Sequence, residues 1–249
     1  VMRRTLLFSG LEAVAFNLNR QQTQLKLFEF GKTYHQFDDK REEFKHLSIF
    51  LTGSKTSENW STPTTTVDFY YLKGIVSSVF EKIGLTTLKT KPIKSDIFDD
   101  GLALVIGKSA VVEFGIVKQN ISKTFGIDQE VFYADFNWDL IFDSISSSKV
   151  KFKPISKFPE VRRDFALLID EDIKFETIYQ LAKQTDHKVL SDINLFDVYK
   201  GENLPKGKKS YAVSFTLQDD SKTLTDKQID KIMSKLQQKF EKEIGAELR

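Results

Sequence analysis

Two side chains at the end of one short run could recognise an unpaired nucleic-acid base. Residues 195–199 read LFDVY, and their alternation predicts a strand with Leu195, Asp197 and Tyr199 on one face. Phe196 and Val198 would then lie on the other face. A tyrosine ring can stack on a base, and a carboxylate can accept hydrogen bonds from a guanine edge. On these residues alone, a tyrosine that covers the strand edge and an aspartate that ends the strand are slightly favoured.

Two further runs would place small residues on the same face. Residues 165–170 alternate, so that Ala166 points away from the apolar set that begins at Phe165. Residues 210–217 turn Ser210 outward and Tyr211 inward. A face built of such small groups lets a flat polar ligand approach the sheet closely. Alone, each small residue is ordinary for a sheet surface.

Four basic residues flank this face: Arg162, Arg163, Lys208 and Lys209. They could neutralise phosphates, which positions a nucleic acid and makes its binding sensitive to salt. For Arg163, the sequence favours a structural ion pair with Asp164 as much as a contact with phosphate.

Other patterns that could carry chemistry are weak. Residues 101–109 resemble a phosphate-binding loop, but five apolar residues separate the glycines where four are needed, so we expect a strand. The acidic pairs at 99–100 and 219–220 adjoin glycine or serine, which favours solvated turns over cation sites. Three histidines lack a partner at ligand spacing: His35, His46 and His187. We therefore expect no catalytic residue and no metal site in this chain.

The elements that would position the candidate face form a compact pattern. After the strand that ends at 170, Asp172 is a predicted N-cap for a helix through residue 185. Thr225 and Gln228 have capping-box spacing before an apolar stripe that ends at Gly245. With residues 246–249 as a short last strand, the order is βαββαβ, a ferredoxin-like motif.

The first half of the chain predicts an antiparallel sheet with helices. Helices are expected at 5–20 and 68–84 with a helical turn at 121–126, and strands at 25–35, 44–53, 88–93, 102–106, 111–117 and 131–138. A serine run and spaced lysines predict a linker at 144–157. We therefore predict two domains, 1–150 and 151–249, in an α+β protein.

Composition sets broad limits. A chain of 249 residues with 40% hydrophobic content can build two cores. It has no cysteine, no apolar run long enough to span a membrane and no signal-peptide pattern, so we expect a cytoplasmic protein. The net charge is only +2, so any RNA contact must come from local placement.

Several segments resemble one family. FPEVRRDFALLID (158–170), NLFDVYKG (194–201), PKGKKSYAVSFTLQ (205–218) and the closing GAELR resemble the ferredoxin-fold anticodon-binding domain of the bacterial phenylalanyl-tRNA synthetase beta chain. RRTLLFSGL (3–11), LFEFGKTY (27–34) and DFYYLKG (68–74) resemble its core domain, which is folded like a class II synthetase but lacks catalysis. At 99–101, DDG departs from the family's usual His-Pro-Gly turn, which leaves that loop's conformation open.

The resemblance implies a function. Asp197, Tyr199, Ala166 and Ser210 match the positions that line an anticodon base. The complete enzyme would be an (αβ)2 heterotetramer that binds tRNA-Phe. Its alpha chain would attach phenylalanine with ATP and Mg²⁺. This chain alone would be inactive, since Phe28-Glu29-Phe30-Gly31 replaces an arginine clamp for ATP phosphates.

Two alternatives from other classes remain open from the sequence. One is a small-molecule ligase built on the first domain, which binding of ATP by the chain would favour. The other is a free-standing RNA-binding regulator, which would bind RNA without associating with a catalytic alpha chain.

Overall fold

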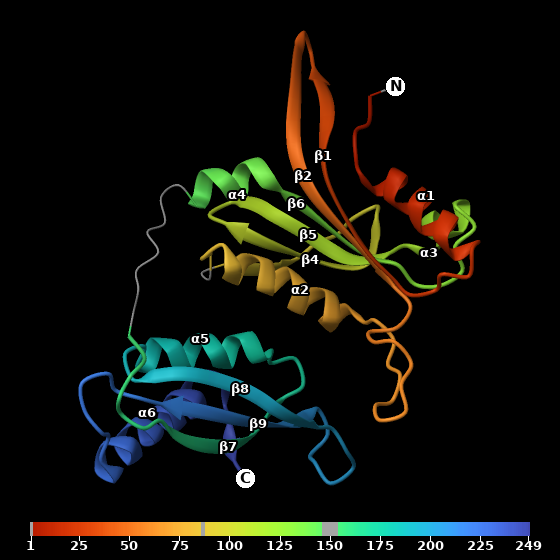
Figure 1. The fold of residues 1–249 in the computed structure, drawn as a ribbon. Helices are drawn as coiled ribbons and strands as arrows, with labels where there is room; N and C mark the ends of the chain where they lie inside the picture. Colours follow the sequence, from red (N-terminus) through yellow and green to blue (C-terminus); the bar gives the residue numbers. More distant parts are fainter. Residues whose placement is uncertain (1, 86–87, 146–153) are drawn as a thin grey trace. The chain divides into compact units, whose positions relative to one another are not determined.

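The computed structural model describes residues 2–85, 88–145 and 154–249. The chain divides into two compact units, Val1–Lys151 and Phe152–Arg249. Each unit has one antiparallel sheet with helices, which confirms the predicted α+β class (Figure 1). The predicted linker at 144–157 lies largely outside the described residues, as does the predicted boundary at 150.

The first unit has a six-stranded sheet in the spatial order β1-β2-β6-β5-β4-β3. Its strands are β1 (Leu25–Phe37), β2 (Lys40–Thr52), β3 (Lys89–Pro92), β4 (Phe98–Ile106), β5 (Ser109–Val117) and β6 (Phe132–Asn137). Its helices are α1 (Leu7–Leu18), α2 (Phe69–Lys82), α3 (Gln119–Thr124) and α4 (Trp138–Ile145). Strands β1 and β2 form a long hairpin that projects beyond the rest of this sheet (Figure 1).

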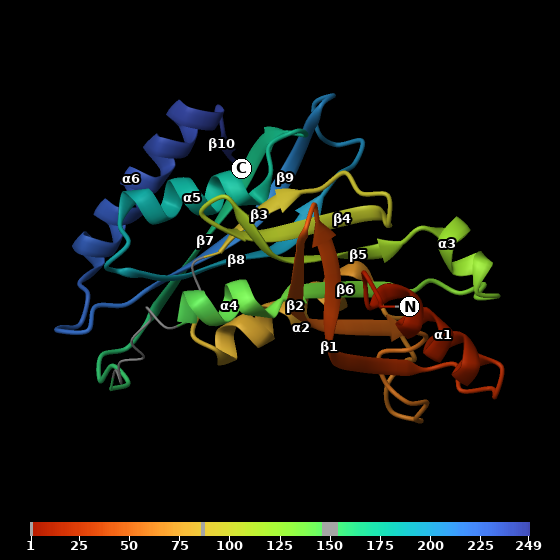
Figure 2. The same cartoon turned by 90° about the horizontal axis from the view of Figure 1, so that it is seen from above.

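Helices cover both faces of the first sheet. Leu72 and Val76 of α2 and Ile141 of α4 are fully buried in one core, on the face that carries Phe114. Helix α1 packs on the other face, in a second core around Tyr133. Helices α1 and α3 lie at one end of the sheet, as both views show (Figures 1 and 2). The apolar stripes of α1 and α2 face these two cores, as expected for helices with one apolar face.

Two predictions for the first unit are wrong. Residues 144 and 145 belong to α4, not to a linker, because the Asn137 side chain accepts a hydrogen bond from Leu140 N (3.1 Å) and begins that helix. Residues 99–101 form no turn but continue β4, where a register shift between Phe98 and Asp100 inserts one extra residue. Because of this bulge, Asp99 and Asp100 are part of β4 and do not end the strand.

The second unit has the predicted ferredoxin-like order. Its elements are β7 (Val161–Asp170), α5 (Phe175–Thr185), β8 (Leu190–Tyr199), β9 (Lys208–Leu217), α6 (Asp226–Ile244) and β10 (Glu247–Leu248). The strands lie in the order β10-β7-β9-β8, and every neighbouring pair is antiparallel. The last strand therefore pairs with the first, and the βαββαβ motif is confirmed.

Both helices of the second unit pack on the same face of its sheet. Ile178 of α5 and Phe240 of α6 join Val213 and Phe215 of β9 in one core. The capping box of Thr225 with its glutamine partner and the left-handed Gly245 (φ 59°) bound α6 as predicted. The N-cap of α5 is Lys174 and not Asp172. A turn closed by Ile173 N and Asp170 O (3.1 Å) delays this helix, which corrects its predicted start.

Candidate nucleic-acid interface

Four residues predicted to line a base lie on two adjacent rows of the second sheet. Ser210 of β9 pairs with Tyr199 of β8 on one side and with Leu168 of β7 on the other. In the next row Ala212 pairs with Asp197 and Ala166. Paired residues point to the same side of a sheet, so all four candidates share one face. We call this the open face, because α5 and α6 pack on the other side.

The open face offers an aromatic ring, a carboxylate and small groups. Tyr199 is 40% exposed and Asp197 is exposed, whereas Ser210 is buried among its neighbours. One carboxylate oxygen of Asp197 accepts a hydrogen bond from Val198 N at 2.9 Å. The carboxylate can accept more than one hydrogen bond. The face can therefore stack one base and accept hydrogen bonds from its edge.

A β-bulge corrects the predicted faces of β8. Leu195 pairs with Val213 and Asp197 pairs with the adjacent Ala212, so Phe196 is an extra residue between them. Leu195 therefore packs against the core and does not share the face of Asp197. Phe196, predicted to point inward, is 49% exposed. Simple alternation fails here because the bulge changes the phase of the strand.

Two of the four basic candidates lie on the open face. Arg162 pairs with Thr216 of β9, and its Nε donates to Oδ1 of Asp164 at 2.8 Å. That hydrogen bond is the main cause that raises the pKa of the exposed Arg162 guanidinium. Lys208 pairs with Asp170, and its Nζ lies 3.0 Å from an oxygen of that carboxylate. Arg162, not Arg163, is the ion-pair partner of Asp164.

The other two basic candidates point to the helix side of the sheet. Arg163 pairs with the buried Phe215, and its guanidinium lies 3.9 Å from Asp226 at the start of α6. Lys209 is only 5% exposed, and its Nζ donates to Glu171 O at 2.9 Å. Neighbouring residues of a strand point to opposite faces of the sheet. Arg162 and Arg163 therefore lie on opposite faces, and so do Lys208 and Lys209. The structure does not bring Arg163 or Lys209 to the open face.

The first unit has a different polar contact that spacing does not reveal. His46 Nδ1 lies 2.8 Å from Oδ1 of Asp135, because β2 and β6 are neighbours in the sheet. Burial, together with the charge of Asp135, raises the pKa of the nearby Glu113. Across the described ranges, no group of three or more His, Cys, Asp or Glu side chains could hold a metal ion.

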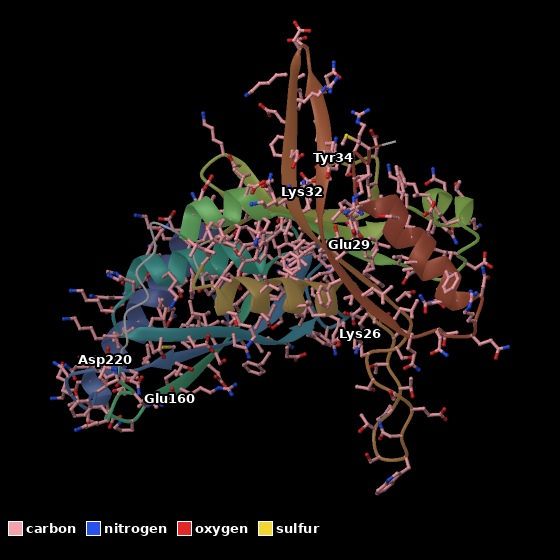
Figure 3. The ribbon with its side chains drawn as sticks, turned by 45° about the horizontal axis from the view of Figure 1, so that its top comes forward. Lys26, Glu29, Lys32, Tyr34, Glu160 and Asp220 are labelled. Atoms are coloured by element: carbon pink, nitrogen blue, oxygen red, sulfur yellow. The ribbon has the colours of Figure 1, made fainter. Side chains whose placement is uncertain are left out.

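An acidic residue occupies β1 where a phosphate-binding cation would be needed. Glu29 accepts a hydrogen bond from Arg3 Nη1 at 2.6 Å, and Arg3 Nε donates to Lys32 O at 3.1 Å. Tyr34 N also donates to Arg3 O, so the N-terminal segment lies along this strand. Figure 3 shows Glu29, Lys32 and Tyr34 in succession on the strand. The carboxylate of Glu29 is therefore paired with Arg3 within this unit.

Comparisons with known proteins cover both units. A phenylalanyl tRNA synthetase beta chain CLM domain matches residues 1–138, and a ferredoxin-fold anticodon binding domain matches residues 156–249. The phenylalanine–tRNA ligase beta subunits of Bacteroides fragilis and Bacteroides thetaiotaomicron are each 44% identical over 260 residues. That of Porphyromonas gingivalis is 38% identical over 260 residues.

The alignments include all of this chain but only part of the relatives. They cover 100% of the chain and 32% of each of the three proteins, so the chain spans about a third of their length. Among the residues that the structure describes, none of the helices combines the length and the hydrophobicity that a membrane-spanning segment needs. Because the two family models match successive segments that make up nearly the whole chain, this chain belongs to the phenylalanyl-tRNA synthetase beta chain family.

Proposed function

We propose that the open face binds the anticodon of tRNA-Phe, in a chain that supports attachment of phenylalanine to that tRNA. The observation that carries this proposal is the strand register, which gathers Tyr199, Asp197, Ala166 and Ser210 on one face. Tyr199 stacks on an unpaired base, and Asp197 accepts hydrogen bonds from its edge. Ala166 and Ser210 leave room for the flat base above the sheet.

The basic residues of the open face have a positioning role in this proposal. Arg162 and Lys208 contact phosphates, which fixes the register of the RNA without reading its sequence. Each already has a carboxylate partner, so binding would exchange or share that ion pair. Their contribution therefore depends strongly on salt.

The first unit has an architectural role in the proposal. We assign residues 1–150 to a non-catalytic core domain and residues 151–249 to an anticodon-binding domain. An alpha chain in an (αβ)2 assembly supplies the catalytic site and handles ATP, Mg²⁺ and phenylalanine. The match to the beta chain family supports the alpha partner. The ion pair of Arg3 with Glu29 supports a core domain that does not clamp ATP.

Binding of tRNA-Phe to the complete synthetase tests the proposal. Stacking of one base on one aromatic is worth about 1–3 kcal/mol, so Tyr199→Ala should weaken binding roughly 5- to 150-fold. Tyr179→Ala on α5 is a matched control, because Tyr179 is also exposed (38%) but lies on a helix. Unchanged binding by Tyr199→Ala would contradict the anticodon assignment.

A further inference from the structure

We propose that Phe196 is a second base-stacking platform on the open face, with Arg162 held against its ring. It would take an unpaired base next to the one that stacks on Tyr199. This inference rests on the proposed anticodon binding and extends it from one base to two.

The bulge in β8 is the first observation behind this proposal. Leu195 and Val198 pair with Val213 and Tyr211, whose side chains lie in the core, although Val198 is itself 47% exposed. The inserted Phe196 is 49% exposed and has no pairing partner in β9. A phenylalanine has no polar group to favour water, so this exposed ring has apolar surface that a base could cover. The bulge therefore supplies an aromatic surface that a regular strand would have turned inward.

Arg162 places the ring on the open face and fixes its surroundings. The guanidinium carbon of Arg162 lies 5.0 Å from the centre of the Phe196 ring. Nε and Nη2 of Arg162 donate to the two carboxylate oxygens of Asp164, at 2.8 and 3.3 Å. Arg162 and Asp164 pair with Thr216 and Ser214, both on the open face. In the free protein the two hydrogen bonds orient the exposed guanidinium of Arg162 beside the ring.

The spacing along β8 suits two bases that are not stacked on each other. Asp197 and Tyr199 are two regular strand residues apart, and the bulge residue Phe196 adds less than one further step, so Phe196 and Tyr199 are separated by roughly 7–10 Å along β8. Stacked neighbours in a duplex strand are only about 3.4 Å apart, so the RNA would have to bind with splayed bases. Splayed, unpaired bases are the state in which single-stranded loops are recognised on sheets with two or three aromatic rings.

The two aromatic rings would contribute to the affinity for RNA, whereas the carboxylate between them would contribute to its sequence specificity. Every base has a π face, so stacking on Phe196 should add affinity with little preference for sequence. Asp197 stands between the two rings and reads hydrogen-bond donors. Phe196 would thus strengthen binding of cognate and altered anticodons alike.

The test measures binding of tRNA-Phe, and of the same tRNA with an altered anticodon, to the complete synthetase. Phe196→Ala should weaken both about 5- to 150-fold, the range for loss of one aromatic stacking contact. Phe196→Trp should bind both tRNAs about as well as wild type does, because tryptophan keeps an aromatic face. Phe196→Leu should bind as weakly as Phe196→Ala, because leucine is apolar but has no π face. Tyr179→Ala is again the matched control, since Lys183 lies over its ring (5.8 Å) on helix α5.

The outcomes separate this inference from the proposed function. If Phe196→Ala or Phe196→Leu binds tRNA-Phe as wild type does, while Tyr199→Ala weakens binding, Phe196 is not a stacking platform. The proposal that the open face binds the anticodon would then be unaffected. If Tyr199→Ala and Phe196→Ala both bind as wild type does, the proposed function itself fails. Thermal unfolding of Phe196→Ala should match wild type, because the ring is exposed; a large decrease in its midpoint would show that Phe196 is structural and overturn the inference.

Discussion

The ring of Tyr199 lies against Gly201, two residues further along the chain. A Cβ atom at position 201 would stand 2.4 Å from Oη and 2.6 Å from Cζ of Tyr199. Real side-chain contacts do not come this close, so the ring occupies space that only glycine leaves empty. The tyrosine ring at the end of β8 therefore uses the space next to Gly201.

Replacement of Gly201 should consequently impair binding of tRNA-Phe without unfolding the protein. In Gly201→Ala the ring of Tyr199 must move, and because it ends a partly exposed side chain that can shift, the loss of affinity should be smaller than that of Tyr199→Ala. Gly74→Ala is the matched control, because no atom lies within 4 Å of its Cβ position. Binding by Gly201→Ala at wild-type affinity would show that the position of the ring is unimportant.

Neighbouring lysines of β9 should behave differently, because they lie on opposite faces. Lys208→Ala should reduce the slope of log affinity against log salt by about 0.7–1, as expected when one phosphate contact is lost. Lys209→Ala should leave that slope unchanged. It should instead lower the free energy of unfolding by about 1–3 kcal/mol, since a buried hydrogen bond to Glu171 O is lost. Titrations at several salt concentrations and denaturant unfolding measure both effects; the reverse pattern would contradict the placement.

The chain alone should neither bind ATP nor activate phenylalanine. Glu29 pairs with Arg3 at the strand where a cation would be needed to hold phosphates. Calorimetry should show no saturable binding up to roughly 1 mM ATP, the upper range of ordinary enzyme substrates. Pyrophosphate exchange by the chain, free of contaminating alpha chain, would refute this expectation.

Asp68 should make the stability of the first unit depend on pH. The hydrogen bond from Lys55, assisted by one from Tyr71 N, lowers the pKa of this carboxyl below 3.8. A lowered folded-state pKa means stabilisation that is present above pH 3.8 and lost as the pH falls through the folded value. Asp68→Ala should therefore cost about 0.5–2 kcal/mol at pH 7, as for loss of an N-cap, and less near pH 3.

Fluorescence of Trp138 measures this effect, because Trp138 packs against the core of the first unit. The chain has one other tryptophan, Trp60, which is 98% exposed and should change little on unfolding. Asp68→Asn is the control that keeps the cap but removes the charge. A difference between wild type and Asp68→Ala that stays constant from pH 7 to pH 3 would exclude the carboxylate as the cause.

Alternation of residue types was sufficient to predict most of the second unit. It placed Leu167 and Val213 in the core and ordered the strands of the βαββαβ motif, because a sheet with one buried face fixes its register strongly. It could also have separated Arg162 from Arg163, since adjacent strand residues point to opposite faces.

Other features depend on contacts that sequence spacing does not contain. The bulge at Phe196 changes the phase of β8, and only the pairing of Leu195 and Asp197 with β9 reveals it. The contact between His46 and Asp135 joins residues 89 positions apart through the neighbouring strands β2 and β6. Helix α4, in contrast, could have been predicted from local spacing, because Asn137 begins it and Ile141 and Ile145 are four residues apart on one apolar stripe.

Discrimination between anticodons by Asp197→Ala tests the central claim most directly. The measurement is the ratio of affinities of the complete synthetase for tRNA-Phe and for the same tRNA with an altered anticodon. We predict that the variant lowers this ratio, because a lost edge contact weakens the right base more than the wrong one, by about 1–3 kcal/mol at one position. If Asp197→Ala and Tyr199→Ala both bind the two tRNAs as wild type does, the anticodon site lies elsewhere and the open face does not read RNA.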